Sequence, residues 1–181
     1  MNIKIYDNKI SLGQAAAEQA ATAIRQAITA NGKARIIAAT GASQFEFLDA
    51  LTKAPDIDWA KVEMFHLDEY IGMPITHPAS FRKYLLERFI QPTGMQTYHL
   101  LDGEANPDEV CAQVGALIAA APIDVAFVEQ AGFPNDSVRV RFDRRYLHTS
   151  IALQVCGREQ IRADSFHRPS PELFVLSLHN I

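Results

Sequence analysis

Short apolar runs alternate with helix-forming segments along residues 1–128, and this alternation constrains the fold more than any other feature. The runs at 35–40, 62–67 and 123–128 are too short for separate helices and are predicted to be buried strands. Residues 4–6 indicate a short first strand. Strands that alternate with helices form right-handed βαβ units. We therefore expect an α/β fold, with a Rossmann-like, mainly parallel sheet flanked by helices.

Helix start signals lie between the predicted strands. Ser11 and Ser43 are each followed three residues later by Gln or Glu, which is the spacing of a capping box. Ser80 is a further candidate cap, and Asn106 precedes a proline and two acids, as at many helix starts. The predicted helices cover approximately residues 11–30, 44–53, 81–89 and 107–120.

The composition changes in the last part of the chain. All six lysines lie at or before Lys83, whereas residues 129–181 contain seven arginines and no lysine. This change indicates either a domain boundary or a stretch of different origin. We expect residues 1–128 to form the α/β unit, and residues 129–181 to be an atypical or incomplete C-terminal segment of the same domain. Its candidate strands are residues 137–142, 151–155 and 173–178.

The charge and composition of the chain limit the partners that it can bind and the cellular location that we expect. The net charge of −4 and the isoelectric point near 5.8 disfavour a nonspecific nucleic-acid surface. No apolar run is long enough to cross a membrane and the N-terminus does not resemble a signal peptide, so a cytoplasmic protein is predicted. Cys111 and Cys156 lack metal-ligand spacing, and no metal site is expected.

The segment Thr40-Gly41-Ala42-Ser43 joins a predicted strand to a predicted helix. Backbone N–H groups at such a junction can bind an anion, and the two hydroxyls can donate to phosphate oxygens. Gly41 would allow the backbone to approach a ligand closely. The alternative is an ordinary strand–helix turn in which Ser43 only caps the helix. Spacing alone favours that alternative.

Two acids, Asp68 and Glu69, follow the predicted strand at 62–67. α/β proteins bind ligands beyond the carboxyl ends of their parallel strands. An ionised carboxylate at this edge can accept a proton as a general base, and a second carboxylate in the same pocket would raise the pKa of the first. A solvated loop acid or a helix cap explains the position equally well.

The most specific pattern in the chain begins at these acids. Residues 67–74 read LDEYIGMP, and residues 77–81 read HPASF. This combination resembles the glucosamine-6-phosphate deaminases, whose pattern is DEYxG, a short gap, and HPxS followed by an aromatic residue. The deaminases belong to a superfamily of glucosamine-6-phosphate isomerases and 6-phosphogluconolactonases. The lactonases typically carry arginine in place of Tyr70, which favours the deaminase branch.

Three other segments match the family in the same order. Residues 39–43 fit its phosphate loop, and the sequence LLDG at 100–103 and the strand at 123–128 also have equivalents. The resemblance therefore covers residues 1–128 and no more of the chain.

The resemblance implies an aldose–ketose isomerisation of glucosamine 6-phosphate that releases ammonia and gives fructose 6-phosphate. Asp68 matches the family's base, which moves a proton between C2 and C1 of the open-chain sugar. Glu69 belongs to the same motif and is expected to contribute to substrate binding. The phosphate anchor is expected at Thr40, Gly41, Ala42 and Ser43. No metal or organic cofactor is implied, and the expected partner is a small sugar phosphate.

The chain departs from the family after its third long apolar run. The family continues with a motif of the form GxGxxGHxAFNxP, which supplies further acid and base groups, whereas residues 128–136 read VEQAGFPND and contain no Gly-His pair. Asp136, Asp143 and His148 are the candidate replacements. An incomplete sheet would also expose apolar surface that a homo-oligomer could cover.

Several functions remain open on this sequence. The chain could be a deaminase of reduced activity, a non-catalytic relative that binds sugar phosphates, or a hydrolase similar to the 6-phosphogluconolactonases. A shifted reading frame that replaced the native residues after 128 would also explain the departure.

Overall fold

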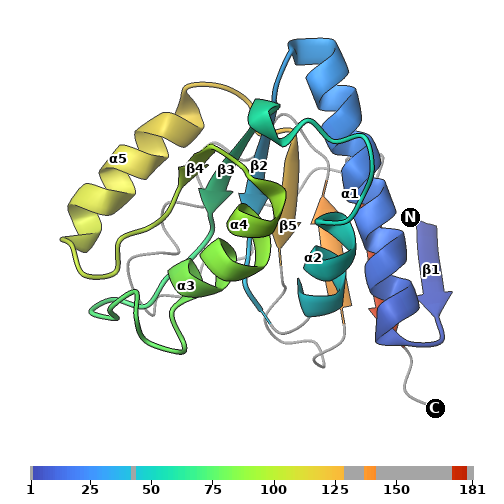
Figure 1. The fold of residues 1–181 in the computed structure, drawn as a ribbon, viewed down its shortest axis with the longest axis horizontal. Coiled ribbons are helices and arrows are strands. Elements are labelled where there is room, and N and C mark those ends of the chain that lie inside the picture. The colour runs from blue at the N-terminus through green and yellow to red at the C-terminus, as the bar shows by residue number, and fades with distance from the viewer. Residues whose placement is uncertain (1, 42–43, 129–136, 142–172, 179–181) are drawn as a thin grey trace.

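The computed structural model describes residues 2–41, 44–128, 137–141 and 173–178, which form helices packed on both faces of a single sheet (Figure 1). The strands are β1 Asn2–Tyr6, β2 Ala34–Ala38, β3 Val62–His66, β4 Thr97–His99, β5 Val125–Val128, β6 Ser137–Arg141 and β7 Leu173–Leu178. The helices are α1 Lys9–Asn31, α2 Phe45–Leu51, α3 Phe81–Leu85, α4 Gln91–Thr93 and α5 Pro107–Ala119, with a 3-10 turn η2 Trp59–Lys61 and a π-helical segment η3 Leu86–Ile90.

The sheet has the strand order β1-β7-β6-β5-β2-β3-β4. The four strands β5, β2, β3 and β4 are parallel, and β1 is parallel to β7. Strand β6 is antiparallel to both of its neighbours. The expected α/β fold with a mainly parallel sheet is therefore confirmed.

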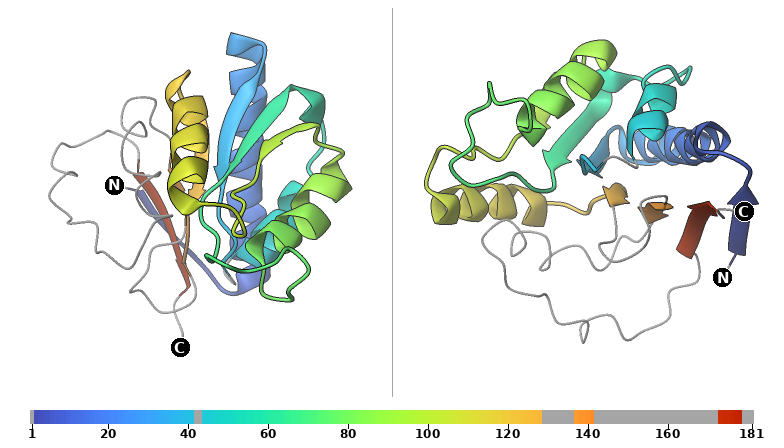
Figure 2. Two further views of the ribbon diagram at one scale, coloured as in Figure 1. Left: turned by 90° about the vertical axis from the view of Figure 1, so that its left-hand side faces the viewer. Right: turned by 90° about the horizontal axis from the view of Figure 1, so that it is seen from below.

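The direction of chain travel across the sheet decides which helices cover which face. From β2 the chain moves to β3 and then to β4, and it returns past β2 to form β5. Right-handed crossovers place the helices of opposite steps on opposite faces. Accordingly, α1, α2 and α3 cover one face, while α5, which connects β4 to β5, lies on the other (Figure 2). The reversal occurs between β2 and β5, which is where α/β sheets open a crevice for ligands.

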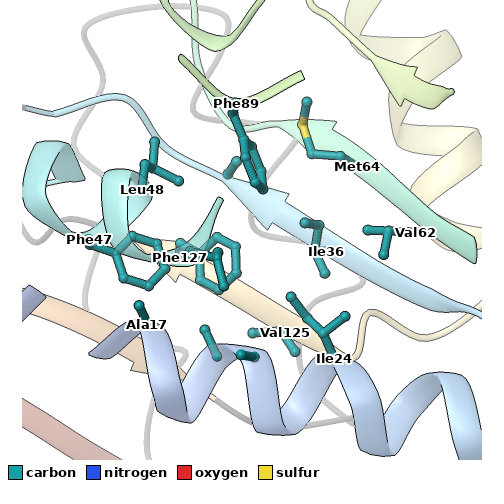
Figure 3. Packing of buried hydrophobic residues seen from close by; sticks show 14 of the residues in the cluster. Ala17, Ile24, Ile36, Phe47, Leu48, Val62, Met64, Phe89, Val125 and Phe127 are labelled. Atoms are coloured by element: carbon teal, nitrogen blue, oxygen red, sulfur yellow. The ribbon is translucent and has the colours of Figure 1, made fainter. Parts of the chain in front are cut away.

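The larger apolar core lies between the sheet and the helices α1 and α2 (Figure 3). Alternate residues of the parallel strands point into it, since successive side chains in a strand point to opposite faces. Phe47, Phe89 and Phe127 are the largest fully buried side chains of this core, and the rings of Phe47 and Phe127 meet edge to face at 4.8 Å between centroids. The smaller core, against α5, contains Ile37, Phe65 and Ile118.

The first helix begins earlier than the sequence suggested. The predicted cap at Ser11 is wrong, because α1 starts at Lys9 and its cap is Asn8. The side chain of Asn8 accepts a hydrogen bond from the Ser11 N–H at 2.9 Å, so Ser11 lies within the first turn. The predicted end is confirmed, since Gly32 follows the helix in the left-handed conformation with φ of 76°.

The remaining helix starts and strands show which elements local sequence signals could predict. Ser80 and Asn106 cap α3 and α5 as predicted, because their side chains accept hydrogen bonds from amides of the first turn. Helix α2 begins at Phe45, close to the predicted start, and the proposed cap Ser43 lies outside the described residues. The strand β4 was not predicted, since it is short and half exposed at the edge of the sheet. Strands β6 and β7 match two of the predicted C-terminal strands, and residues 151–155 lie outside the described part.

Helices α1 and α2 approach each other closely at Gly13. A Cβ atom placed on Gly13 would lie 2.7 Å from the Glu46 carbonyl carbon and 2.9 Å from the Phe47 nitrogen. Both are backbone atoms, which cannot move aside without moving the helix. Glycine is therefore required at this position by packing.

We expect Gly13→Ala to destabilise the protein, although alanine in a helix interior is normally favoured over glycine by about 0.5–1 kcal/mol. The overpacking should cost about 1–3 kcal/mol and reverse the sign of that gain. Urea unfolding of the variant and the parent measures the difference. An increase in the free energy of unfolding would contradict the close contact.

Candidate active site

The loops that follow β2 and β3 leave the sheet at neighbouring positions. The strands pair in register, with Ala38 opposite His66, and the Leu67 N–H donates to the Ala38 carbonyl at 3.0 Å. Thr40 and Asp68 each lie two residues beyond that register pair. Both loops therefore open at the same edge, towards which the carboxyl ends of β2, β3 and β5 point (Figure 1). The two segments singled out in the sequence are brought together there.

The structure describes half of the predicted phosphate loop. Thr40 is buried, and its hydroxyl has no hydrogen-bond partner among the described residues. The Gly41 carbonyl accepts a hydrogen bond from the Gln44 N–H at 2.9 Å, which forms the turn that leads into α2. Ala42 and Ser43 lie outside the described residues. The role of these four residues in phosphate binding stays a prediction.

Asp68 is half buried at the start of a loop that we call the rim loop, residues 68–75. This loop connects the end of β3 to the turn before α3, and it exposes the side chains of Tyr70 and Ile71. The ring of Tyr70 contacts the ring of Phe81 in α3, with centroids 4.9 Å apart. Asp68 therefore lies just beyond the carboxyl end of β3, at the edge of the sheet where α/β proteins bind ligands, which is a suitable place for a base.

The neighbouring acid, Glu69, turns its carboxylate towards the start of α3. It accepts hydrogen bonds from the backbone N–H groups of Tyr70, Phe81 and Arg82 at 2.9, 3.2 and 2.8 Å, and from the Ser80 hydroxyl at 2.9 Å. A carboxylate has about four lone-pair sites, so these donors use its capacity to accept. A direct contact between Glu69 and a substrate stays a prediction that this geometry does not favour.

The hydrogen bonds to Glu69 also control its ionisation. Burial raises the pKa of this carboxyl, but the four donated hydrogen bonds outweigh burial and hold the pKa below its usual value of 4.5. The folded protein therefore prefers the ionised form. The stability that Glu69 contributes is present above the usual carboxyl pKa, and it is lost as the pH falls through the lowered pKa of the folded state.

We expect Glu69→Gln to reduce the free energy of unfolding most at neutral pH. The amide presents an NH₂ group to four donors and cannot accept from all of them, whereas the protonated glutamic acid in the parent has the same defect in acid. The difference between the two proteins should therefore shrink as the pH falls below the ordinary carboxyl pKa. Urea unfolding at successively lower pH values measures it, and a constant difference would contradict the assignment.

His66 is the last residue of β3 and lies on the same face of the sheet as Met64. Burial lowers its pKa to about 4, although the charge of Glu69 opposes this shift. Its Nδ1 atom accepts a hydrogen bond from the Leu101 N–H at 3.4 Å. At neutral pH the ring is thus uncharged and fixed by the adjacent loop.

Two other side-chain contacts were not predicted from the sequence, one beside the rim loop and one near the start of β3. Arg82 extends from α3 beneath the rim loop and is buried, and only its tertiary partners distinguish it from a solvated helix residue. His99 was assigned no partner, but its Nε2 atom lies 3.0 Å from Glu63. The candidate replacements Asp136, Asp143 and His148 lie outside the described residues.

Other classes of site are not found in the described part of the chain. It contains no cluster of three or more His, Cys, Asp or Glu side chains that could hold a metal ion. The helices among the described residues are also too short or too polar to span a membrane.

Comparison with known proteins identifies the family. A sequence profile of the glucosamine-6-phosphate isomerases/6-phosphogluconolactonases matches residues 7–133, which is more than half of the chain. The chain belongs to this family. Its match to the glucosamine-6-phosphate deaminase of Streptomyces coelicolor is 31% identical over 110 residues, covering 59% of this chain and 41% of that protein. The chain thus spans less than half of that relative's length.

Solved structures of the family share the fold. A 6-phosphogluconolactonase from Shewanella baltica superposes with a TM-score of 0.61 at 21% identity, covering 68% of this chain and 54% of its own. A monomeric glucosamine-6-phosphate deaminase gives a TM-score of 0.60 at 21% identity, covering 66% and 51%. The family's two activities are therefore both represented among proteins of the same architecture.

Proposed function

We propose that this family member converts glucosamine 6-phosphate to fructose 6-phosphate and ammonia, with Asp68 as the base. The observation that carries the proposal is the register of β2 and β3, which brings Thr40 and Gly41 next to Asp68 at one edge of the sheet. A phosphate held at the first loop would place the other end of a hexose near the second. Binding energy from a remote phosphate can orient the reacting carbons.

The proposed chemistry requires one positioned carboxylate to move a proton. Asp68 removes the proton from C2 of the open-chain ammonium sugar, and the ammonium group of the substrate gives a proton to the C1 carbonyl oxygen, which becomes an enol hydroxyl. Return of the proton to C1 gives the ketose imine, and water then releases ammonia and leaves the C2 carbonyl. An ionised carboxylate within reach of the C2 proton can take up this proton as a general base.

We propose that turnover is slower than in relatives with the Gly-His motif. The chain lacks that motif after residue 128, and the missing groups open the sugar ring and handle later protons in the family. The loss of one general acid or base commonly costs about 10²–10⁴-fold in rate. A low kcat with measurable substrate binding would fit this arrangement.

Two alternatives remain as candidates. Structural similarity to the 6-phosphogluconolactonases supports a hydrolase that opens 6-phosphogluconolactone. The absent Gly-His pair supports a sugar-phosphate-binding relative without turnover. In either case the bound partner is a small sugar phosphate.

The test is to measure ammonia and fructose 6-phosphate from glucosamine 6-phosphate, with 6-phosphogluconolactone as a parallel substrate. Formation of both products supports the deaminase. Hydrolysis of the lactone alone supports the second candidate, and calorimetric binding of hexose phosphates without turnover supports the third. The absence of turnover and of binding would reject all three.

The remaining proposals concern the chain as a whole. Because β6 and β7 pair within the sheet that contains β5 and β1, we propose that residues 129–181 belong to the same domain as residues 1–128.

We also propose a cytoplasmic protein without nucleic-acid partners, consistent with the net charge of −4. A homo-oligomer is proposed to cover apolar surface, and light scattering would measure it.

A further inference from the structure

The guanidinium of Arg82 joins α3 to two loops. Its side chain is 7% exposed, and its Nη2 atom donates to the Met73 carbonyl at 2.8 Å and to Glu104 at 3.2 Å. Its Nη1 atom donates to Asp102, and its Nε atom lies 3.5 Å from the Glu69 carboxylate. One side chain of α3 thus contacts the rim loop at Glu69 and Met73 and the turn that follows β4 at Asp102 and Glu104.

These loops also meet through their backbones. The Gly72 N–H donates to the Gly103 carbonyl at 2.6 Å, and Gly72 adopts a φ of 76° that favours glycine. A Cβ atom on Gly103 would collide with the Tyr70 carbonyl oxygen and lie 3.2 Å from that of Met73. The rim loop therefore lies directly against the turn, and Arg82 bonds to both.

The negative charges around Arg82 explain why a cation is needed between the rim loop and the turn. Three carboxylates, those of Glu69, Asp102 and Glu104, lie within ion-pair distance of one guanidinium. Asp102 and Glu104 are half exposed and remain hydrated, whereas the Glu69 side chain is 1% exposed. Removal of the cation would leave three acids that repel one another, one of them buried. The rim loop would then lose its attachment to the turn.

We propose that Arg82 and Glu69 are a positioning pair that holds the rim loop and thereby fixes the base Asp68. Glu69 directly follows Asp68, so its hydrogen bonds to α3 set the backbone from which the Asp68 side chain extends. Arg82 holds the far end of the same loop at Met73. Neither side chain needs to touch the substrate. The proposal rests on the proposed role of Asp68 as the base.

Kinetics of Arg82→Ala test the positioning role. A base displaced by about 1 Å can lose about 10²-fold in rate, so kcat should fall by about that factor while KM changes by less than about threefold. Added guanidinium ion should restore part of kcat, and sodium chloride at equal ionic strength should not. Arg88→Ala is the matched control, because Arg88 is exposed on the same helical segment. An unchanged kcat in Arg82→Ala would overturn the proposal.

Hydrogen exchange tests the attachment of the loop without reference to activity. In Arg82→Ala, the amides of residues 70–73 and of Ile75 should exchange faster, whereas those of β2 and β3 should keep their protection. If Arg82→Ala does not fold, Asp102→Asn removes one contact at the half-exposed end and should loosen the same amides to a smaller extent. If hydrogen exchange in this loop is the same in the variant and in the parent protein, Arg82 and Glu69 are not a positioning pair. This holds even if the parent protein is an active deaminase. If the parent protein does not convert glucosamine 6-phosphate, the proposed function is rejected. Hydrogen exchange then still decides whether Arg82 holds the rim loop in place.

Discussion

Asp68→Asn is expected to lower the turnover of glucosamine 6-phosphate by about 10²–10⁴-fold, because the amide cannot accept the C2 proton. Asparagine has nearly the same shape and stays half buried beside the crevice, so the binding of a hexose phosphate should change little. The release of ammonia and of fructose 6-phosphate measures turnover. Calorimetry with a hexose phosphate that lacks the amino group measures binding.

Asp49→Asn is the matched control for this substitution. Asp49 lies on the exposed side of α2, outside the rim loop. Its carboxylate forms an exposed ion pair with Lys53 at 2.7 Å. The same chemical change there should leave kcat and KM unaltered. If Asp68→Asn retains the turnover of the parent, the carboxylate is not the base and the proposed chemistry is wrong.

The parts of the fold that the sequence predicted depend on local interactions. Asn106 caps α5 through its own side chain, which accepts from N–H groups two and three residues later. Gly32 ends α1 for an equally local reason, namely its left-handed backbone. Where two local signals compete, as with Asn8 and Ser11, the spacing of polar residues alone does not decide the helix start.

The candidate site was predicted only as far as sheet topology allows. Parallel strands bring Thr40 and Asp68 to one edge, and that inference needs only the order of the elements. Position alone does not distinguish the roles of Asp68 and Glu69, and the family resemblance led us to expect that Glu69 binds the substrate, whereas its carboxylate is turned towards α3. Their difference arises because the amides of Phe81 and Arg82, far along the chain, meet one carboxylate.

The partners of Arg35 in the core could not be predicted from the sequence either, because most of them lie far from it along the chain. It is the second residue of the apolar strand β2, yet its side chain is 4% exposed and reaches the C-terminal end of α5. Its Nη2 atom donates to the Leu117 carbonyl at 2.6 Å, and its Nη1 atom donates to those of Ile118 at 3.2 Å and Ala121. Its Nε atom donates to Glu63 at 2.9 Å. One residue thus donates to carbonyls in and just beyond the last turn of α5, where the helix itself supplies few N–H partners, although the Leu117 carbonyl also accepts from the Ala120 N–H at 3.3 Å.

Arg35→Met is therefore expected to destabilise the protein by about 3–5 kcal/mol, the usual cost of removing one partner of a buried ion pair. Methionine fills similar space but removes the ion pair with Glu63 and the hydrogen bonds that Arg35 donates to the carbonyls at the end of α5. Arg35→Lys keeps the charge but cannot donate in several directions from a planar group, so its loss should be intermediate. Urea unfolding at neutral pH measures all three proteins.

The control for this prediction is Arg25→Met in α1, where the arginine is 29% exposed and also donates to the Pro55 carbonyl at 2.9 Å. Arg25 also forms an ion pair, with Glu18 at 2.9 Å, but that carboxylate is 68% exposed. Exposed pairs contribute about 0–1 kcal/mol, because water solvates both partners when the pair is broken. The same substitution should thus cost several times less at position 25 than at position 35. Equal losses at the two sites would show that the end of α5 does not depend on the Arg35 guanidinium, and that the packing of α5 against Ile37 and Phe65 stabilises that face by itself.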